Sequence, residues 1–202
     1  MPGQTLENGM AKQKHIIPVR PHDKIELTVE SQGSSGDGIS KHKGYTLFVP
    51  GGIPGDLVFA EVMKITPRFG VTRIIEQRSP SRDRIKAPCP VFTQCGGCKL
   101  QDIKYEKQME FKVGVVKDAL KHIGKIESSS IRSVPAEKTY NYRNKGSFAI
   151  QKQAGFIRMG FFKQGSHDVI STERCGILHD PINDAKEFIR ELLIKHQVSI
   201  YD

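Results

Sequence analysis

The chain has 202 residues, of which 37% are hydrophobic and 26% charged, a composition typical of a folded globular protein rather than a disordered or fibrous one. No apolar run approaches the roughly 20 residues that a membrane-spanning helix needs, and the N-terminal segment lacks the apolar core of a secretion signal. We therefore expect a cytoplasmic protein with no membrane partner, whose four cysteines stay reduced. The net charge of +9 favours a polyanionic partner, although charge alone does not distinguish nucleic acid from an ordinary basic surface.

The first part of the chain predicts a small all-β domain. Residues 1–22 are expected to form a flexible tail, and residues 23–84 contain short alternating apolar and polar runs separated by glycine-rich turns. A period of two predicts strands with one buried face. Four or five such strands over this length predict a small antiparallel β-barrel. The residues expected inside are Ile25, Leu27, Val29, Tyr45, Leu47, Val49, Val58, Ala60 and Val62.

Basic residues cluster around the turns of this predicted barrel. Residues 11–87 contain thirteen Lys and Arg against eight Asp and Glu. Barrels of the oligonucleotide-binding type use such loops to hold phosphates while an exposed aromatic side chain stacks on a base. The alternative is a solvated basic surface with the aromatic ring inside the barrel. The candidate RNA contacts here are Lys41, Lys43, Arg68, Phe69 and Arg73.

Residues 36–85 resemble a TRAM domain. The resemblance rests on the FVPGGIPGD turn at residues 48–56 and the SPSR sequence at residues 79–82. It implies a barrel of the oligonucleotide-binding type attached to an RNA-modifying enzyme.

Three cysteines lie within ten residues, in the sequence CPVFTQCGGC, and the fourth is far downstream. The spacing is Cys89-x5-Cys95-x2-Cys98, followed by Cys175. Two glycines between Cys95 and Cys98 permit a tight turn that directs both sulfurs toward one centre. Four thiolates hold either tetrahedral zinc or an iron–sulfur cluster. Spacing alone leaves zinc and cluster equally open, with four unrelated buried thiols as the remaining alternative.

The residues around the cysteines carry a second resemblance. The sequence APCPVFTQCGGCKLQDIKYEKQMEFK closely resembles the cluster segment of bacterial RNA 5-methyluridine methyltransferases, in the ribosomal-RNA branch of the uracil-5-methyltransferase family. The resemblance implies an N-terminal TRAM domain and a [4Fe–4S] cluster bound by Cys89, Cys95, Cys98 and Cys175. It also implies that S-adenosylmethionine donates the methyl group to a uridine, with 23S ribosomal RNA as the expected partner.

Residues 85–202 are expected to form an α/β central region that completes an α+β fold. A helix is predicted over residues 102–122, with a core stripe of Met109, Val113, Val116, Leu120 and Ile123. Residues 139–150 and 155–162 predict paired strands, and an amphipathic helix is predicted near the C-terminus, capped by Asn183 or Asp184.

Basic and aromatic residues alternate through residues 138–175, as single-stranded RNA recognition requires. Some of these aromatic residues are expected in the core. The resemblance continues through YRNK, GFF and SHDVI and favours Arg143 and Lys145 as RNA contacts. Arg158 is a further candidate.

The sequence contains no candidate catalytic residue of its own. We expect the Rossmann-like domain that binds S-adenosylmethionine and supplies the nucleophile to be absent, and the 202-residue chain to be an inactive, monomeric fragment. The alternative is a self-standing RNA-binding iron–sulfur or zinc protein. The apolar face of the last helix distinguishes the two, since a self-contained protein is expected to cover it.

Overall fold

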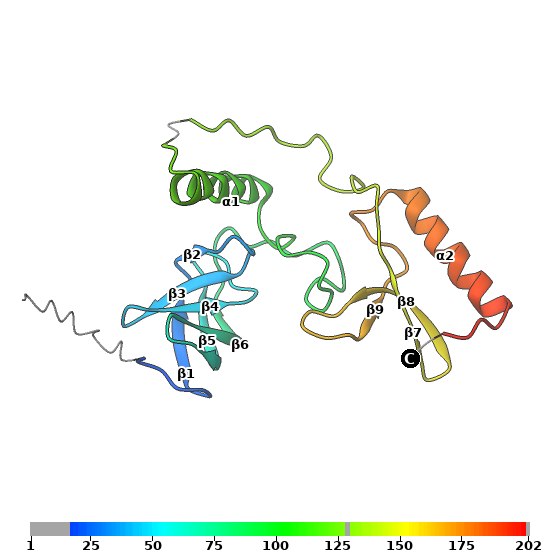
Figure 1. The fold of residues 1–202 in the computed structure, drawn as a ribbon, viewed down its shortest axis with the longest axis horizontal. Coiled ribbons are helices and arrows are strands. Elements are labelled where there is room, and N and C mark those ends of the chain that lie inside the picture. The colour runs from blue at the N-terminus through cyan, green and yellow to red at the C-terminus, as the bar shows by residue number, and fades with distance from the viewer. Residues whose placement is uncertain (1–16, 128–129, 201–202) are drawn as a thin grey trace, which may run out of the picture.

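The computed structural model describes residues 17–127 and 130–200 and contains two β-sheets, one near each end of the described chain (Figure 1). The expected tail over residues 1–22 lies mostly outside the described residues. The strands are β1 (Lys24–Thr28), β2 (Ser31–Gln32), β3 (Gly38–His42), β4 (Tyr45–Val49), β5 (Leu57–Ile65), β6 (Phe69–Ser79), β7 (Ala149–Gln153), β8 (Phe156–Phe162) and β9 (Val169–Ser171). The helices are α1 (Tyr105–Asp118), the π-helical turn η1 (Ala119–Ile123) and α2 (Asp180–Lys195).

The first sheet has six strands in the order β1-β5-β6-β4-β3-β2. Every second residue of β4 and of the first half of β5 is buried, as the alternating sequence predicted. The core consists of Val19, Leu27, Val29, Tyr45, Leu47, Val49, Val58, Ala60 and Val62. Eight of the nine predicted interior residues are therefore buried, and the ninth, Ile25, packs against the cluster half-buried.

The expectation of an exclusively antiparallel arrangement is wrong for one pair of strands. β4 and β6 run parallel, with Thr46 opposite Phe69 and Phe48 opposite Val71. The two edges of the sheet are β1 and β2, which follow one another in the chain. Between them, the Glu30 amide donates to the Ile39 carbonyl at 2.8 Å, so this stretch of chain links β5 to β3 and curls the sheet around its core.

The helix predicted over residues 102–122 is present, but its core stripe is not. No residue of α1 or η1 is buried, and Val116 and Ile123 are 47% and 84% exposed. The helix begins at Tyr105 because the preceding residues, Asp102 to Lys104, are bonded to the segment around Asp83 and Ile85 instead. α1 lies alongside the first sheet without closing onto it (Figure 1).

The second sheet is antiparallel, in the order β7-β8-β9, and α2 packs against β8. The predicted hairpin is confirmed: Ala154 and Gly155, both with positive φ, form the two-residue turn between β7 and β8. The second sheet buries Met159 and Val169, and the chain beyond it buries Ile177 and Leu178.

The predicted C-terminal helix is confirmed, but it starts earlier than expected. The face that packs inward is the one opposite the apolar face. Pro181 occupies the first turn, where its missing N–H costs nothing, so the helix begins at Asp180 and Asn183 is not its cap. The buried residues of α2 are Asn183 and Lys186. The apolar face is exposed, with Phe188 at 61% and Ile189 at 43%.

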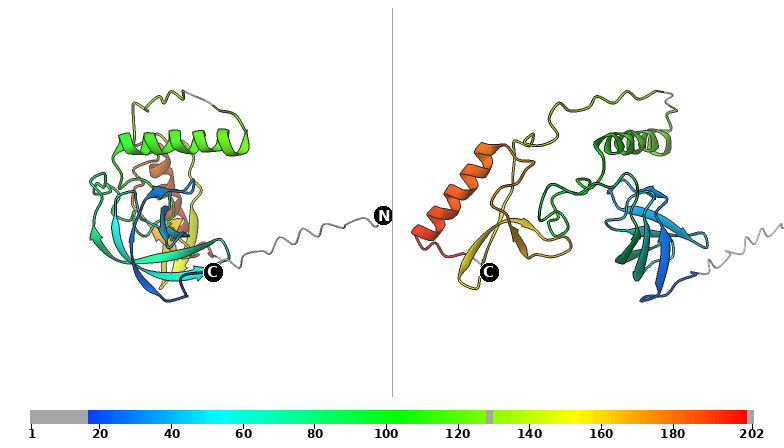
Figure 2. Two further views of the ribbon diagram at one scale, coloured as in Figure 1. Left: turned by 90° about the vertical axis from the view of Figure 1, so that its left-hand side faces the viewer. Right: turned by 180° about the vertical axis from the view of Figure 1, so that it is seen from behind.

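The segment from residue 85 to residue 104 lies between the two sheets in Figure 1 and in the right-hand view of Figure 2. On one side, Lys99 forms an ion pair with Asp37 at 3.2 Å. On the other side, the Gly96 amide donates to the Phe162 carbonyl at 3.0 Å, and Cys95 forms an isolated β-bridge with Lys163. The cysteine-bearing segment is thus bonded to both halves of the molecule.

Arg84 joins this segment to the first sheet through two carboxylates. Its guanidinium forms ion pairs with Asp56 and Asp102 and donates to the Gly51 carbonyl at 2.9 Å. Asp56 is fully buried and also accepts the amides of Ile53 and Ser81, each at 2.9 Å. The Asp56 carboxylate therefore holds the PGGIPGD turn next to the residues that follow β6.

The two carboxylates that contact Arg84 have pKa values displaced in opposite directions. Burial pushes the pKa of Asp56 upward, but the hydrogen bonds and charge of Arg84 and two backbone amides outweigh burial and hold it below its ordinary value. For Asp102, burial dominates, and the pKa lies above its ordinary value despite the charge of Arg84.

We predict that Asp56→Asn lowers the free energy of unfolding by about 3 kcal/mol at pH 7, because Arg84 loses its fully buried counter-charge and keeps only Asp102. A carboxylate with a lowered pKa stabilises the fold above its unfolded-state pKa, near 4, and that stabilisation is lost as pH falls through the folded-state pKa. Urea unfolding at pH 7 and at pH 3 measures both effects. The difference between wild type and variant is expected to shrink at the lower pH.

Glu76→Gln is the matched control, because Glu76 pairs with Arg78 at 2.7 Å on the exposed surface of β6. Removing that pair should change stability by less than about 1 kcal/mol. An equal loss in both variants would show that the Asp56 ion pair has no special role.

Candidate metal centre and nucleic-acid interface

Cys95 and Cys98 lie on a tight loop that packs against the second sheet. The chain turns between Cys89 and Cys95, where the amides of Gln94 and Cys95 both donate to the Val91 carbonyl. At Gly96 the loop approaches the sheet so closely that a β-carbon would lie 3.1 Å from the Phe162 carbonyl oxygen. Packing against β8 therefore favours glycine at this position.

Two N–H groups are directed at the sulfurs of this loop. The Gly97 amide lies 3.4 Å from Cys95 Sγ, and the Gln101 side-chain amide lies 3.2 Å from Cys98 Sγ. Donors of this kind stabilise a thiolate and tune a metal bound to it. Gln101 was not singled out from the sequence; its place three residues after Cys98 is a signal that could have found it.

All four cysteines line one small cavity. Cys89, Cys95 and Cys98 enter it from the loop, and Cys175 enters it from the chain that follows β9. All four are half-buried free thiols. The cavity is completed by Val91, Phe92, Gly97, Gln101, Arg143, Phe161, Thr172, Gly176 and Ile177. The structure therefore brings the predicted ligand set together across a long sequence separation.

Among residues 17–127 and 130–200, no group of three or more His, Cys, Asp or Glu side chains is arranged to hold one metal ion. Burial raises the pKa of the Cys95 and Cys98 thiols, and the neighbouring cysteines raise it further, while the N–H donors of Gly97 and Gln101 oppose the rise. Without a cation these thiols retain their protons, and a bound metal would replace them.

Tyr140 is an additional neighbour of the cysteines. Burial raises the pKa of its phenol, and Cys98 and Cys89 add to the rise. The ring was expected only as one of several aromatic residues interleaved with basic ones. Its position beside the cysteine cavity follows from the Asn141 and Arg143 amides, which donate to the Gly176 and Ile177 carbonyls at 2.9 Å.

The candidate RNA contacts of the first sheet gather at one end of it. Because β4 and β6 run parallel, the turn before β4 and the turn before β6 lie side by side, and Tyr45 Oη donates to the Thr66 carbonyl at 2.7 Å. Lys41, Lys43 and Arg68 are exposed at this end. Phe69 is 37% exposed and packs edge-on against Phe48. This set, Lys41, Lys43, Arg68 and Phe69, is called the basic end below.

Arg73, in contrast to these residues, is held in an ion pair. It lies on β6 opposite Glu61, and its guanidinium pairs with that carboxylate at 2.7 Å. The hydrogen bonds from His22 and Arg73 lower the pKa of Glu61 and keep it charged. Arg73 is therefore partly neutralised, unlike the residues of the basic end.

The remaining candidate contacts lie on the second half of the molecule. Arg143 is exposed and lines the cysteine cavity, Lys145 is exposed two residues further on, and Arg158 is exposed on β8 opposite Gln151. The structure thus separates the predicted contacts into the basic end and a second group near the cysteines.

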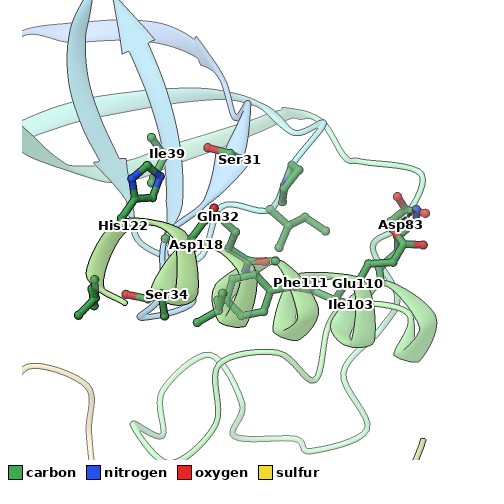
Figure 3. Close-up of a pocket in the computed structure, with 18 residues that line it drawn as sticks. Ser31, Gln32, Ser34, Ile39, Asp83, Ile103, Glu110, Phe111, Asp118 and His122 are labelled. Carbon is green, nitrogen blue, oxygen red and sulfur yellow. Dashed lines mark hydrogen bonds and ion pairs between the residues drawn. The ribbon is translucent and has the colours of Figure 1, made fainter. Parts of the chain in front are cut away.

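A larger groove of about 730 Å³ runs between α1 and the β2–β3 turn (Figure 3). Ile39, Ile103 and Phe111 contribute its apolar surface. Asp83, Glu110 and Asp118 supply carboxylates to the same groove, and Lys107, which also lines it, pairs with Glu110 at 2.7 Å. The carboxylates outnumber the lysine, which disfavours a phosphate backbone.

In the described part of the chain, no helix combines the length and apolarity that crossing a bilayer requires.

Comparison with known proteins first defines the class of the N-terminal half. Residues 19–75 match the TRAM domain family, a range that covers the first sheet up to the middle of β6. The chain therefore carries a TRAM domain.

Comparison of the whole chain then identifies its relatives. It is 37% identical to an uncharacterized RNA methyltransferase of Halalkalibacterium halodurans over 92% of this chain, and 34% identical to one of Clostridium tetani over 94%. In both cases the match spans only 41% of the relative's length. The chain is thus homologous to bacterial RNA methyltransferases along less than half of their length.

A solved structure shares the fold. The tRNA (uracil-54, C5)-methyltransferase of Pyrococcus abyssi, crystallised with S-adenosyl-L-homocysteine, superposes with a TM-score of 0.60 at 24% identity. The superposition covers 87% of this chain and 38% of that protein. The arrangement of both sheets therefore recurs in a larger protein.

We predict that Gly160→Ala disrupts the second sheet and, with it, the approach of Cys175 to the other cysteines. A β-carbon at Gly160 would lie 2.0 Å from the Ile170 carbonyl oxygen, so β8 and β9 must separate to admit it. The expected loss is about 2–3 kcal/mol, measured by thermal unfolding.

Gly114→Ala provides the control, since a β-carbon there meets nothing within 4 Å on α1. Alanine in a helix should raise stability by up to about 1 kcal/mol. A neutral Gly160→Ala variant would contradict the close approach of β8 and β9.

Proposed function

We propose that the chain is the RNA-recognition part of an S-adenosylmethionine-dependent methyltransferase that forms 5-methyluridine in 23S ribosomal RNA. The observation that carries the proposal is the convergence of four cysteines on one cavity beside exposed basic residues, in a chain homologous to RNA methyltransferases. The TRAM domain supports RNA as the ligand. Two groups of cations, the basic end and the residues around Arg143, would contact phosphates.

The four cysteines are proposed to hold a [4Fe–4S] cluster. All four cysteines line the same cavity, and the N–H groups of Gly97 and Gln101 are directed at two of the sulfurs. Such N–H···S hydrogen bonds stabilise the thiolates of either a zinc ion or a cluster. The resemblance of the residues around the cysteines to a cluster segment is what favours iron and sulfide over zinc.

The residues of this chain would bind and orient RNA rather than transfer the methyl group. Methylation at uracil C5 proceeds by thiolate attack on C6, and S-adenosylmethionine supplies the methyl group when bound. All four cysteines of this chain are assigned to the cluster, so the nucleophile and the S-adenosylmethionine site are proposed to lie in the part of the relatives that this chain does not span. We expect the 202-residue chain alone to be inactive.

We predict that replacing Lys41, Lys43 and Arg68 with Gln weakens RNA binding mainly through lost phosphate contacts. For single-stranded RNA, each contact contributes roughly 0.7 to the slope of log K against log salt concentration. The triple variant should therefore bind with a slope smaller by about 2. Fluorescence anisotropy with labelled 23S rRNA fragments, over a range of KCl concentrations, measures this slope.

The matched control replaces Lys117, Lys121 and Lys125, exposed residues in and after α1, with Gln. It removes the same charge and should leave the slope nearly unchanged. Equal effects of the two triple variants would reject the basic end as the phosphate site. Tighter binding of a transfer-RNA transcript than of any 23S fragment would reassign the substrate to transfer RNA.

The cluster is tested by anaerobic purification followed by absorption spectroscopy and analysis of iron, sulfide and zinc. We expect a brown protein with about four irons and four sulfides per chain. Single Cys→Ser variants at positions 89, 95, 98 and 175 should lose most of both.

Stoichiometric zinc without colour would reject the cluster and favour an RNA-binding zinc protein. Protein purified without metal is reconstituted anaerobically with iron and sulfide, and failure of the wild type to take up both would also reject the cluster.

A further inference from the structure

We propose that Asn183 and Lys186 are positioning residues that hold Cys175 in the cysteine cavity. The inference rests on the proposed cluster site and concerns the one ligand that does not belong to the cysteine loop. The two residues lie three apart on α2 and face the same side. Both are buried polar residues on a helix whose apolar side chains are exposed.

Asn183 forms hydrogen bonds with both the backbone amide and the backbone carbonyl of Cys175. Its Oδ1 accepts the Cys175 amide at 2.8 Å, while its Nδ2 donates to the Cys175 carbonyl at 3.2 Å and to the Leu178 carbonyl at 3.4 Å. Asn183 is 1% exposed, so the Cys175 amide would lose this hydrogen bond in a buried setting if the side-chain amide were removed, whereas the Cys175 carbonyl would keep the Leu178 amide at 3.0 Å. Asn183 is therefore bonded directly to the residue that carries the thiol.

Lys186 holds the residues immediately before Cys175. Its ammonium group donates to the Thr172 carbonyl and, at 2.9 Å, to the Glu173 carbonyl. It also pairs with Glu187 at 2.8 Å and lies 5.9 Å from the centre of the Phe148 ring. A buried lysine is costly unless it is paired in this way. The cation thus fixes the end of β9, and with it the path of the chain into the cavity.

The other three cysteines have no comparable dependence on α2. Cys89, Cys95 and Cys98 are held by turns within their own loop and by the bonds of Gln94, Cys95 and Gly96 to β8 and the following turn. Loss of Asn183 or Lys186 should therefore release Cys175 selectively. In a cluster, the iron that loses its thiolate is the one most readily removed, which converts a four-iron into a three-iron cluster.

The adjacent Arg174 supplies a contrast within the same segment. It pairs with Asp180 and Asp184, each at 2.7 Å, but its side chain is 51% exposed. Exposed ion pairs contribute little to holding a backbone in place. Arg174→Gln is therefore the matched control for Asn183→Ala and Lys186→Met, because it removes contacts to the same helix from the residue next to Cys175.

The first measurement is amide hydrogen exchange by NMR on the metal-free 202-residue chain. We expect the Cys175 amide to exchange at least 10-fold faster in Asn183→Ala, and to lose protection also in Lys186→Met, which releases the carbonyls of Thr172 and Glu173. Arg174→Gln should resemble the wild type. Unchanged protection of Leu47 and Val58 in the first sheet verifies that a variant is folded. Wild-type protection of Cys175 in both variants would overturn the proposal.

The second measurement follows iron loss to a chelator after anaerobic reconstitution. Loss of an outer residue that orients a ligand typically weakens metal binding by 10–100-fold, so iron should leave Asn183→Ala and Lys186→Met faster by this factor. After one-electron oxidation with ferricyanide, which converts a three-iron cluster to its half-integer-spin state, electron paramagnetic resonance should detect that cluster in these variants and not in Arg174→Gln. Retention of all four irons at the wild-type rate would overturn the proposal.

The two measurements separate the positioning role from the cluster itself. A wild-type chain that takes up no iron and sulfide rejects the proposed cluster. The exchange experiment needs no metal and still decides whether Asn183 and Lys186 fix Cys175.

Discussion

The ion pair between Arg84 and the buried Asp56 is the constraint on which the arrangement of the described chain depends. Asp56 accepts hydrogen bonds from two backbone amides that lie in separate turns. Arg84, its ion-pair partner, also pairs with Asp102, just before α1. Asp56 and Arg84 thus hold the start of the cysteine-bearing segment against the first sheet. The stability of this point is electrostatic, in contrast to the apolar packing of Leu47, Val49 and Val58 inside the sheet.

The cysteine-bearing segment acts as the common border of the two sheets. Lys99 contacts the β2–β3 turn, while Gly96 pairs with the end of β8. Polar contacts connect this segment to both sheets, and Phe161 of β8 adds an apolar side chain beside the cysteines. A metal centre bound there would stabilise the relation between the TRAM domain and the second sheet as well as its own loop.

Burial that follows a short sequence period could be predicted from the sequence. Contacts between segments that lie far apart in the sequence could not. The alternation through Tyr45, Leu47 and Val49 identified buried positions directly, because a strand presents alternate residues to opposite faces. The same reasoning failed for α1, where no residue of the predicted apolar stripe is buried and only Ile123 of that stripe lines the groove beside the helix. It also failed for Asn183 and Lys186, since a polar residue on a helix is ordinarily solvated. Their burial is explained only by the carbonyl of Cys175 and those of its neighbours, to which they donate. The cysteine set was predicted by spacing and resemblance, whereas the position of Tyr140 beside it became visible only in three dimensions.

The separation of Cys175 from the other three cysteines has a consequence for the order of events on the ribosome. Cys175 is synthesised roughly 80 residues after Cys98, a delay of about 4–16 s at ordinary translation rates. During that interval the first sheet and the loop with three thiols exist without their fourth partner or the helix that holds it. The nascent chain therefore passes through a period in which an incomplete thiol set is open to oxidants and to stray metal ions, and its protection falls to the cell rather than to the fold.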